Sequence, residues 1–352
     1  MTRSIGAQCW RVEVNPLVTG MRATHRLNVT FLVGLGTHKG GTTSLNAVLT
    51  GVEAITSRMS ERLVHSEPKE CHFLEKPNGT IEAYLNACWQ RRCSANHNST
   101  AVCFEISPRY MLRSGVGAML SLLPNVRAFA LLRDPIARAW SGYLQYVMKD
   151  QPLPTFRTLV RAEMRAYQRC AAPDARVAEW LAVQSCVLTN LMHPSNKAFP
   201  ALRANSSIVR HFGLPVCRGL YALQLRHLRK SFRGELHLML SEMYFSDPVP
   251  LLHDLLAWAA PSVVGRVTTS ELHLLARRAA SSFRNSRASM AKEPLVLNVT
   301  DPLHSELHHF FVPFSAALRC DYPQLAKSPY ATWLPDSCPH TVLKDSRLYS
   351  HP

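Results

Sequence analysis

The fold class is decided by the stretch Gly36-Thr37-His38-Lys39-Gly40-Gly41-Thr42-Thr43-Ser44-Leu45. The apolar run 29–35 precedes this stretch, and the run 43–50, which favours a helix, follows its glycines. Gly51 is the expected end of that helix, because glycine commonly occupies the position just after a helix C-terminus. The pattern predicts a buried strand, a tight turn and a short helix.

This turn has the composition of an anion-binding loop. Glycines let backbone N–H groups close around an anion without Cβ clashes, and a helix N-terminus adds partial positive charge. Lys39 adds a full charge, and Thr42, Thr43 and Ser44 add hydroxyl donors. The alternative is a glycine-rich turn that binds no ligand.

The order of residues differs from the nucleotide-triphosphatase loop. In that loop the lysine directly precedes a Ser or Thr that binds Mg²⁺. Here Lys39 is followed by Gly40 and Gly41. We therefore expect a phosphate-like donor that is bound without a metal.

A second segment predicts another anion contact. The apolar run 126–132 reads as a buried strand and leads into Arg133, and Asp134 is a good helix N-cap. Arg138 and Ser141 are spaced i, i+3 and share a helix face. Ligands bind at the carboxyl ends of parallel strands, so Arg133 and Ser141 are candidates to bind a second phosphate. The alternative is an ordinary Arg–Asp surface pair.

These two segments together resemble the sulfotransferases that use 3′-phosphoadenosine 5′-phosphosulfate (PAPS). The stretch 39–45 resembles the 5′-phosphosulfate loop of that family, and 132–143 resembles its 3′-phosphate segment. Further similarity at 218–225, 240–242 and 301–314 extends the resemblance over about residues 28 to 334. The resemblance implies that the donor is bound by Lys39, Gly40, Gly41, Thr42, Thr43, Ser44, Arg133 and Ser141.

A third segment is similar to the heparan sulfate and related carbohydrate sulfotransferases. The stretch 66–74 contains a Glu-x-His-Phe sequence at Glu70 and His72. The resemblance implies that Glu70 is the general base. From the chemistry of sulfuryl transfer we expect Lys39 to neutralise charge on the leaving oxygen, and His72 either to orient the acceptor or to share the developing charge. The alternatives are a solvated carboxylate at Glu70 and a packing histidine at His72.

The sequence departs from this group in two places. Ile106 stands where the group often has a lysine, and Arg109 is a candidate replacement for its charge. A C-terminal Lys-Gly-Arg loop is not recognisable, and Arg284 or Arg287 could substitute for it. The alternative for both arginines is a solvated loop.

The charge and the cysteines bound the partners and the compartment. A net charge of +16 favours an anionic donor and an anionic glycan acceptor, and no nucleic-acid-binding motif is present. Ten cysteines together with five N-x-[ST] sequons suggest a secretory lumen, and the resemblance implies that this is the Golgi. The N-x-[ST] sequons are at Asn28, Asn78, Asn98, Asn205 and Asn298.

Local spacing suggests two disulfides but no metal site. The pairs are Cys88 with Cys93 and Cys320 with Cys338. A zinc site at Cys88, Cys93 and His97 lacks a fourth ligand, and the histidines between 304 and 309 are expected on one solvated helix face. No apolar run is long enough to span a bilayer, and residues 1–26 show no signal-peptide core. We expect either a truncated start that lacks the membrane anchor or a soluble form.

We expect an ill-defined leader at 1–26, a sulfotransferase domain at 27–335 and a loose tail at 336–352. The predicted fold is α/β, a P-loop-type parallel sheet with helices on both faces. Expected strands are 29–34, 102–106, 126–132 and 235–241. Expected helices are 43–50, 135–149, 155–170, 221–232 and 302–318, and expected loops are 86–100 and 190–217.

The sequence thus predicts a PAPS-dependent O-sulfotransferase with a carbohydrate acceptor. Three alternatives stay open at this point. The first is a tyrosylprotein sulfotransferase, and the second is a nucleotide-dependent kinase, which requires Mg²⁺. The third is a catalytically silent glycan-binding protein that kept the fold.

Overall fold

A computed structural model gives the conformation of most of the chain. It describes residues 2–5, 10–14, 21–25, 29–57, 61–66, 70–75, 80–89, 100–113, 115–123, 125–147, 154–170, 180–192, 215–288 and 297–338. The chain divides into two units. The first unit comprises residues 1–132 and 228–289, and the second comprises 133–227 and 290–352.

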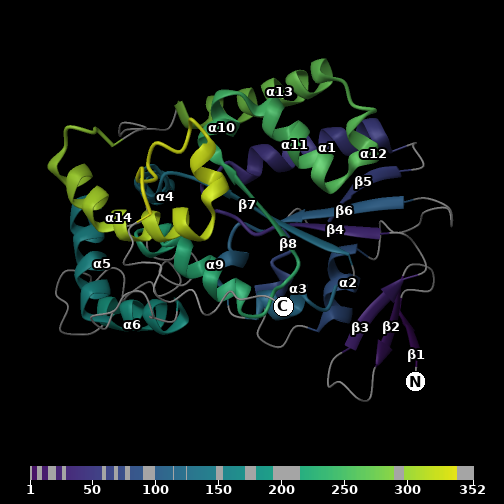
Figure 1. Ribbon diagram of the computed structural model, residues 1–352, viewed down its shortest axis with the longest axis horizontal. Coiled ribbons are helices and arrows are strands. Elements are labelled where there is room, and N and C mark those ends of the chain that lie inside the picture. The colour runs from purple at the N-terminus through teal and green to yellow at the C-terminus, as the bar shows by residue number, and fades with distance from the viewer. Residues whose placement is uncertain are drawn as a thin grey trace. The chain divides into compact units, whose positions relative to one another are not determined.

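The first unit is built on a five-stranded sheet with the strand order β5-β6-β4-β7-β8 (Figure 1). Its strands are β4 (Val29–Gly34), β5 (Glu61–His65), β6 (Thr100–Ile106), β7 (Val126–Leu132) and β8 (Glu235–Leu240). All four pairings are parallel. The predicted α/β class and parallel sheet are confirmed, and β5 is an edge strand that the sequence did not predict.

The strands form where apolar runs are buried on both faces of the sheet. Leu32 packs into one core with Phe104 and Leu131, while its neighbour Phe31 meets the Trp89 ring at a centroid distance of 5.9 Å. Burial on both faces explains why these strands read as continuous apolar runs instead of alternating ones.

Helices cover both faces of this sheet, as predicted. Figure 1 shows one group above the sheet and another below it. The upper group is α1 (Thr42–Thr56), α10 (Ser241–Ser246), α11 (Pro248–Ala259), α12 (Pro261–Val264) and α13 (Thr269–Ala288). The lower group is α2 (Ile81–Trp89) and α3 (Val116–Leu120), and two short turns, η1 (Phe73–Glu75) and η2 (Tyr110–Leu112), follow β5 and β6.

The expected end of α1 at Gly51 is wrong. The helix continues through Gly51 to Thr56. A Cβ at Gly51 would lie 2.3 Å from a methyl carbon of Leu275 on α13, so the missing side chain allows the two helices to pack closely. This glycine therefore serves helix packing and does not end the helix.

Three further strands lie in the N-terminal segment, for which the sequence predicted no element. They are β1 (Thr2–Ile5), β2 (Trp10–Val14) and β3 (Met21–His25). They form an antiparallel sheet in the order β1-β2-β3. The predicted domain limits near residues 27 and 335 stay predictions.

The described elements of the second unit are helical. They are α4 (Pro135–Val147), α5 (Phe156–Cys170), α6 (Trp180–Met192), η3 (Cys217–Gly219), α14 (Pro302–Asp321) and η4 (Pro323–Lys327). Helix α9 (Tyr221–Arg229) begins in this unit and ends in the first. The predicted helices at 135–149, 155–170, 221–232 and 302–318 are confirmed. The predicted loop at 86–100 is wrong over 86–89, which belong to α2, and at Thr100, which begins β6, while 90–99 lie outside the described residues.

The described residues contain three disulfides, two of which the sequence did not predict. They are Cys71–Cys88, Cys170–Cys186 and Cys320–Cys338. The expected Cys88–Cys93 pair is wrong, because the Cα atom of Cys71 lies 5.9 Å from that of Cys88, within disulfide reach. The expected Cys320–Cys338 pair is confirmed, and Cys93 lies outside the described residues.

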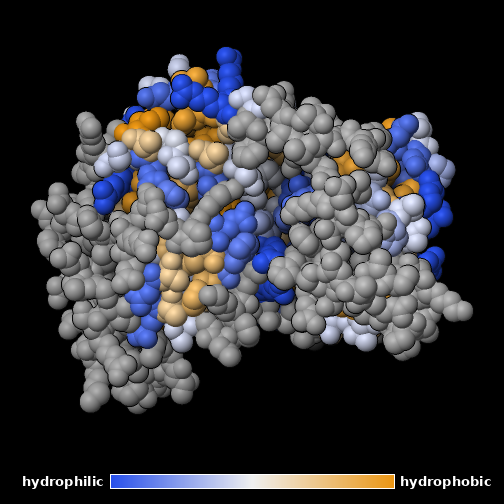
Figure 2. Space-filling model, turned by 180° about the vertical axis from the view of Figure 1, so that it is seen from behind, coloured by the Kyte–Doolittle hydropathy of each residue, from blue (hydrophilic) through white to orange (hydrophobic). Residues whose placement is uncertain are grey.

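Hydrophilic and hydrophobic residues lie side by side on the coloured surface that Figure 2 shows. Large exposed hydrophobic side chains among the described residues are Phe245, Leu274, Val299 and Val312. They come from separate segments, and isolated apolar residues of this kind are normal on protein surfaces. Among the helices that the structure describes, none combines the length and apolar character needed to cross a bilayer.

Candidate active site

The predicted donor loop connects β4 to α1 at the carboxyl end of the parallel sheet. Gly41 has a φ of 96° and caps α1 in the left-handed region, which only glycine adopts at little cost. A Cβ at Gly40 would lie 2.5 Å from the carbonyl oxygen of Leu131. Both glycines are therefore required by this backbone path, one for its dihedral angle and one for its closeness to β7.

Lys39 also adopts the left-handed region, with a φ of 71°. A non-glycine residue in this region carries backbone strain of about 1–3 kcal/mol, and such strain concentrates at ligand sites. The surrounding bonds hold the loop in this shape. The backbone N–H and the hydroxyl of Thr37 both donate to the Leu131 carbonyl oxygen, each at 3.0 Å. The Leu131 N–H donates to the Gly36 carbonyl oxygen at 2.8 Å.

Helix α10, which follows β8 directly, also holds the loop. The Ser241 hydroxyl donates to the Gly40 carbonyl oxygen at 2.7 Å, and the hydroxyls of Ser44 and Tyr244 lie 2.9 Å apart. Burial raises the pKa of Tyr244 to about 12, so its hydroxyl stays protonated and can donate. The sequence analysis did not predict this support, because Ser241 lies far along the chain from the loop.

The start of α1 presents backbone donors and no negative charge. The helical ladder begins with the bond from the Leu45 N–H to the Gly41 carbonyl, at 3.0 Å. The N–H groups of Thr42, Thr43 and Ser44 precede that bond, so no carbonyl within the helix accepts from them. No acidic residue lies in the first turn. The residues that the sequence assigned to an anion thus form a positively polarised helix end beside Lys39.

The strand order supports the position of this loop. The connection that follows β4 leads toward β6 and β5, whereas the connection that follows β7 leads to β8 on the opposite side. Ligands of open α/β sheets bind outside the carboxyl ends of strands at such a switch point. The loop after β4 lies there, and β7 ends at Leu132, directly before Arg133.

The predicted acceptor residues Glu70 and His72 are paired in the structure. Their carboxylate oxygen and ring Nε2 lie 3.0 Å apart, and each side chain is about one-third exposed, at 32% and 33%. The segment is therefore accessible and carries a carboxylate and an imidazole in direct contact. Such a pair can accept a proton from a hydroxyl group placed beside it.

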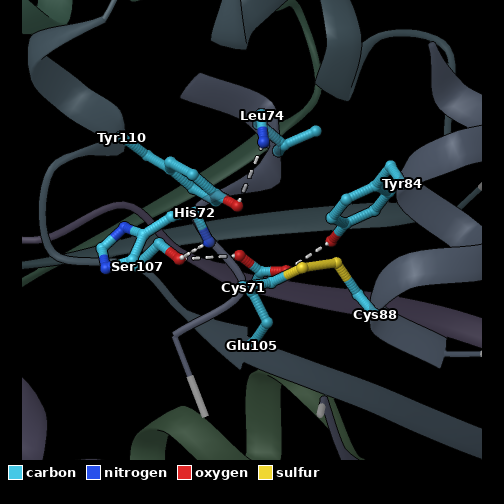
Figure 3. The surroundings of a disulfide bond; sticks show 8 residues. All are labelled: Cys71, His72, Leu74, Tyr84, Cys88, Glu105, Ser107 and Tyr110. Atoms are coloured by element: carbon cyan, nitrogen blue, oxygen red, sulfur yellow. Dashed lines mark hydrogen bonds between the residues drawn. A yellow bond between two sulfur atoms is a disulfide. The ribbon is translucent and has the colours of Figure 1, made fainter. Parts of the chain in front are cut away.

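A buried carboxylate lies behind this pair, and the sequence analysis missed it. Glu105 at the end of β6 is fully buried and accepts hydrogen bonds of 2.9 Å from Tyr84 and from Ser107 (Figure 3). Burial raises its pKa, although hydrogen bonds from Tyr110, Tyr84 and Ser107 act in the opposite direction. The only sequence signal was a glutamate within an otherwise apolar strand.

The same residue lies close to a disulfide. Ligand atoms of Cys71, Cys88 and Glu105 are all within 4.8 Å of one another, which is a spacing that metal ligands can have. Both sulfurs belong to the Cys71–Cys88 disulfide, however, so they are not thiolates that could bind a metal. The cluster is therefore best described as a structural support.

Arg109, Arg284 and Arg287, the candidate replacements for charges that the resembling family has, lie in different elements. Arg109 is half-buried in the turn after β6. Its neighbour Pro108 lies against the donor loop, because a Cβ at Gly36 would be 2.8 Å from the Pro108 carbonyl oxygen. Arg284 and Arg287 belong to α13 and not to a loop, and their side chains lie outside the described residues.

Arg133 and Ser141, the predicted 3′-phosphate residues, belong to the second unit. The Asp134 carboxylate caps α4 by accepting from Ile136 at 2.7 Å and Ala137 at 3.0 Å, as the sequence predicted. The hydroxyl of Tyr221 donates to the Arg133 carbonyl at 2.8 Å. The backbone at Arg133 is therefore fixed from both sides of the strand-to-helix junction.

The Arg138 side chain is buried and supports the backbone of a neighbouring turn. It donates to the Pro215 carbonyl oxygen. Glu163 on α5 is buried as well and accepts from the N–H groups of Val216 at 2.9 Å and Cys217 at 2.6 Å. Burial raises the pKa of Glu163 to about 7. These two side chains hold the turn that leads into α9.

Comparison with known proteins adds one structural likeness. A sulfotransferase from Alicyclobacillus acidocaldarius is similar to this chain at 18% sequence identity and a TM-score of 0.47. The match covers 84% of this chain and 96% of that protein. No model of a protein family matches the sequence, and no curated protein does. An identity and a TM-score this low do not assign an activity to the chain, which is therefore argued from its own residues.

Proposed function

We propose that the chain is a PAPS-dependent O-sulfotransferase whose acceptor is a hydroxyl group of an anionic, glycosaminoglycan-like carbohydrate. The observation that carries the proposal is the donor loop. It combines a lysine placed before two glycines, three amides at a helix N-terminus and a first turn without acidic residues. These are features of a site for phosphate and sulfate oxygens in which the lysine supplies the compensating charge.

In the proposed reaction an acceptor hydroxyl oxygen attacks the sulfur atom of PAPS. A new oxygen–sulfur bond forms while the bond between sulfur and the 5′-phosphate oxygen breaks, and 3′-phosphoadenosine 5′-phosphate leaves. Glu70 takes the hydroxyl proton, and Lys39 neutralises the charge that develops on the leaving oxygen. Arg133 and Ser141 are assigned to the 3′-phosphate of the donor. Positioning and charge stabilisation dominate such group transfers.

Charge and disulfides support the proposed acceptor and compartment. The net charge of +16 attracts an acidic glycan as well as the donor. Disulfides persist in oxidising compartments, and the described residues contain three. Asn298 is exposed within its sequon, whereas Asn28, Asn78, Asn98 and Asn205 lie outside the described residues. These features support a lumen of the secretory pathway, and we propose that it is the Golgi lumen.

A transfer screen with sulfate-labelled PAPS tests the proposal. The acceptors are anionic glycosaminoglycans, neutral glycans and tyrosyl peptides, each assayed in EDTA, and a parallel arm offers labelled ATP with Mg²⁺. The proposal expects label in an anionic glycan without added metal. Label confined to the peptides would instead support tyrosylprotein sulfation, and label from ATP alone a kinase. No transfer in any arm would contradict an enzymatic function.

The proposed base has a matched control in the same unit. A second carboxylate–imidazole pair joins Glu53 and His65 at 2.5 Å, between α1 and β5. We expect Glu70→Gln to lower kcat by about 100-fold or more, with donor binding kept, because the amide cannot accept the proton. Glu53→Gln should leave kcat within a few-fold of wild type. Equal rates for the two variants would remove Glu70 as the base.

A further inference from the structure

The Glu105 carboxylate is an unusual feature at the carboxyl end of this sheet. It lies on β6, opposite Val33 of β4, and no part of its side chain reaches solvent. A buried charge is costly unless hydrogen bonds compensate it. Figure 3 shows Tyr84 from α2 and Ser107 reaching the carboxylate from two sides, and each bonds a different carboxylate oxygen. The proposed reaction gives no direct role to this group.

Ser107 relays the position of Glu105 to the candidate base. The Ser107 hydroxyl donates to one Glu105 carboxylate oxygen at 2.9 Å, so its proton points toward Glu105. The lone pairs of the same hydroxyl then accept the backbone N–H of His72, at 3.1 Å. The chain of contacts therefore runs from the carboxyl end of β6 to the backbone between Glu70 and Phe73 (Figure 3).

The backbone of His72 needs such support. Its φ of 51° lies in the left-handed region, which a non-glycine residue adopts at a cost of about 1–3 kcal/mol unless neighbours hold it. Cys71, the preceding residue, is tied to α2 by its disulfide. The N–H of Leu74, two residues further on, donates to Tyr110 at 3.4 Å. In this conformation the His72 ring reaches Glu70 at 3.0 Å.

We propose that Glu105 is a positioning residue for sulfuryl transfer, which acts through Ser107 to fix the His72 backbone and so the Glu70–His72 pair. The inference rests on the proposed function. The positioning role distinguishes Glu105 from an ordinary core residue. Its loss should lower turnover further than the loss of a core residue that costs the same stability. A group 1 Å out of place can cost about 100-fold in rate.

Ser107→Ala is the most direct test, because it cuts the relay and leaves the Glu105–Tyr84 bond in place. Thr56→Val is its matched control. Thr56 is another fully buried hydroxyl in the first unit, which accepts the Leu63 N–H at 3.3 Å and donates to Val52 at 3.0 Å. Glu105→Gln is the second variant. Tyr84→Phe is the third, and because it removes only a hydroxyl it serves as the milder test if Glu105→Gln fails to fold.

Four quantities are measured for each variant. They are kcat for labelled-sulfate transfer, the Kd of 3′-phosphoadenosine 5′-phosphate, the Tm, and hydrogen exchange of a peptide spanning 70–74. We expect Ser107→Ala to lower kcat by about 10- to 100-fold with the Kd within about twofold and faster exchange of the peptide. Thr56→Val should lower the Tm comparably and leave kcat and the exchange of 70–74 unchanged.

The outcomes separate this inference from the proposed function. A kcat loss in Ser107→Ala no larger than in Thr56→Val would overturn the positioning role, and so would a loss explained by weaker nucleotide binding. Unchanged exchange of 70–74 in Ser107→Ala would overturn it whatever the activity. Absence of transfer by the wild-type chain would instead contradict the sulfotransferase function itself.

Discussion

The hydroxyl of Ser241 donates a hydrogen bond of 2.7 Å to the carbonyl oxygen of Gly40. This bond ties the segment after β8 to the donor loop, which lies two hundred residues earlier in the chain. Without the Ser241 hydroxyl, the buried carbonyl of Gly40 would lose this donor. Leaving a buried acceptor unsatisfied costs about 1–3 kcal/mol of stability. The shape of the loop therefore depends on β8 as well as on its own glycines.

Ser241→Ala should weaken the binding of 3′-phosphoadenosine 5′-phosphate by about 3- to 10-fold, because the loop loses a support but keeps its amides. Calorimetric titration measures the change. Ser121→Ala is the control, since the Ser121 hydroxyl also donates to a carbonyl, that of Ser231 at 2.6 Å, away from the loop. Equal affinities in the two variants would show that the Ser241 bond does not shape the donor site.

Gly40→Ala should destabilise the chain by about 1–3 kcal/mol, because its Cβ would lie 2.5 Å from the Leu131 oxygen and the backbone would have to shift. Thermal unfolding is the measurement. Gly265→Ala is the comparison, since a Cβ there meets nothing within 4 Å and its φ is −72°. A Gly40→Ala protein as stable as Gly265→Ala would be incompatible with the described path of the loop.

The stability of the chain should fall as the pH rises through 7. Glu163 has a pKa of about 7 when folded, against 4.5 when unfolded, so the folded chain binds the extra proton between these values. Its contribution is therefore complete below pH 4.5 and is lost as the pH passes the folded pKa. Glu163→Gln should flatten the dependence of Tm on pH between 4.5 and about 7. Glu306 on α14 is paired with Arg161 of α5, whose hydrogen bond lowers the pKa of this carboxyl. Glu306→Gln should therefore leave the slope in this range unchanged, and an unchanged slope in Glu163→Gln would contradict this assignment.

Loss of the Cys71–Cys88 disulfide should lower turnover more than loss of Cys170–Cys186. The two bridges span sequence separations of 17 and 16, so removing either should cost a similar amount of stability, about 3 kcal/mol. Only the first adjoins His72. Double serine variants are compared by Tm and by kcat for sulfate transfer. Similar kcat values for both would argue against a role of the first bridge in holding the Glu70–His72 segment.

The sheet was largely predictable because its inner strands are apolar on both faces. Runs such as Val126–Leu132, whose last five residues are buried, are typical of strands inside a parallel sheet. The edge strand Glu61–His65 was not predicted, because its apolar residues are only Leu63 and Val64 between polar ends. The predicted helix end at Gly51 was wrong because this glycine accommodates Leu275 of α13. A contact between residues so far apart in the chain cannot be predicted from local sequence.

The site was predictable where its chemistry is contiguous in the sequence. Lys39 to Ser44 form the end of one loop and the first turn of α1, and Glu70 pairs with His72 two residues away. Glu105 was missed because its partners Tyr84 and Ser107 come together only through the packing of α2 on β6. The predicted partner of Cys88 was wrong for a similar reason, because Cys71 and Cys93 both lie near it in the sequence and the fold selects Cys71. The Cys320–Cys338 pair was predicted correctly.

We propose above all that the loop around Lys39 binds a doubly phosphorylated adenylate without a metal. Calorimetric titration of 3′-phosphoadenosine 5′-phosphate into the wild-type chain and Lys39→Ala, in EDTA, tests it most directly. We predict binding to the wild-type chain that is weakened about tenfold or more in the variant and is tighter than that of ADP. Absence of binding in EDTA, or tighter binding of ADP in the presence of Mg²⁺, would contradict the account.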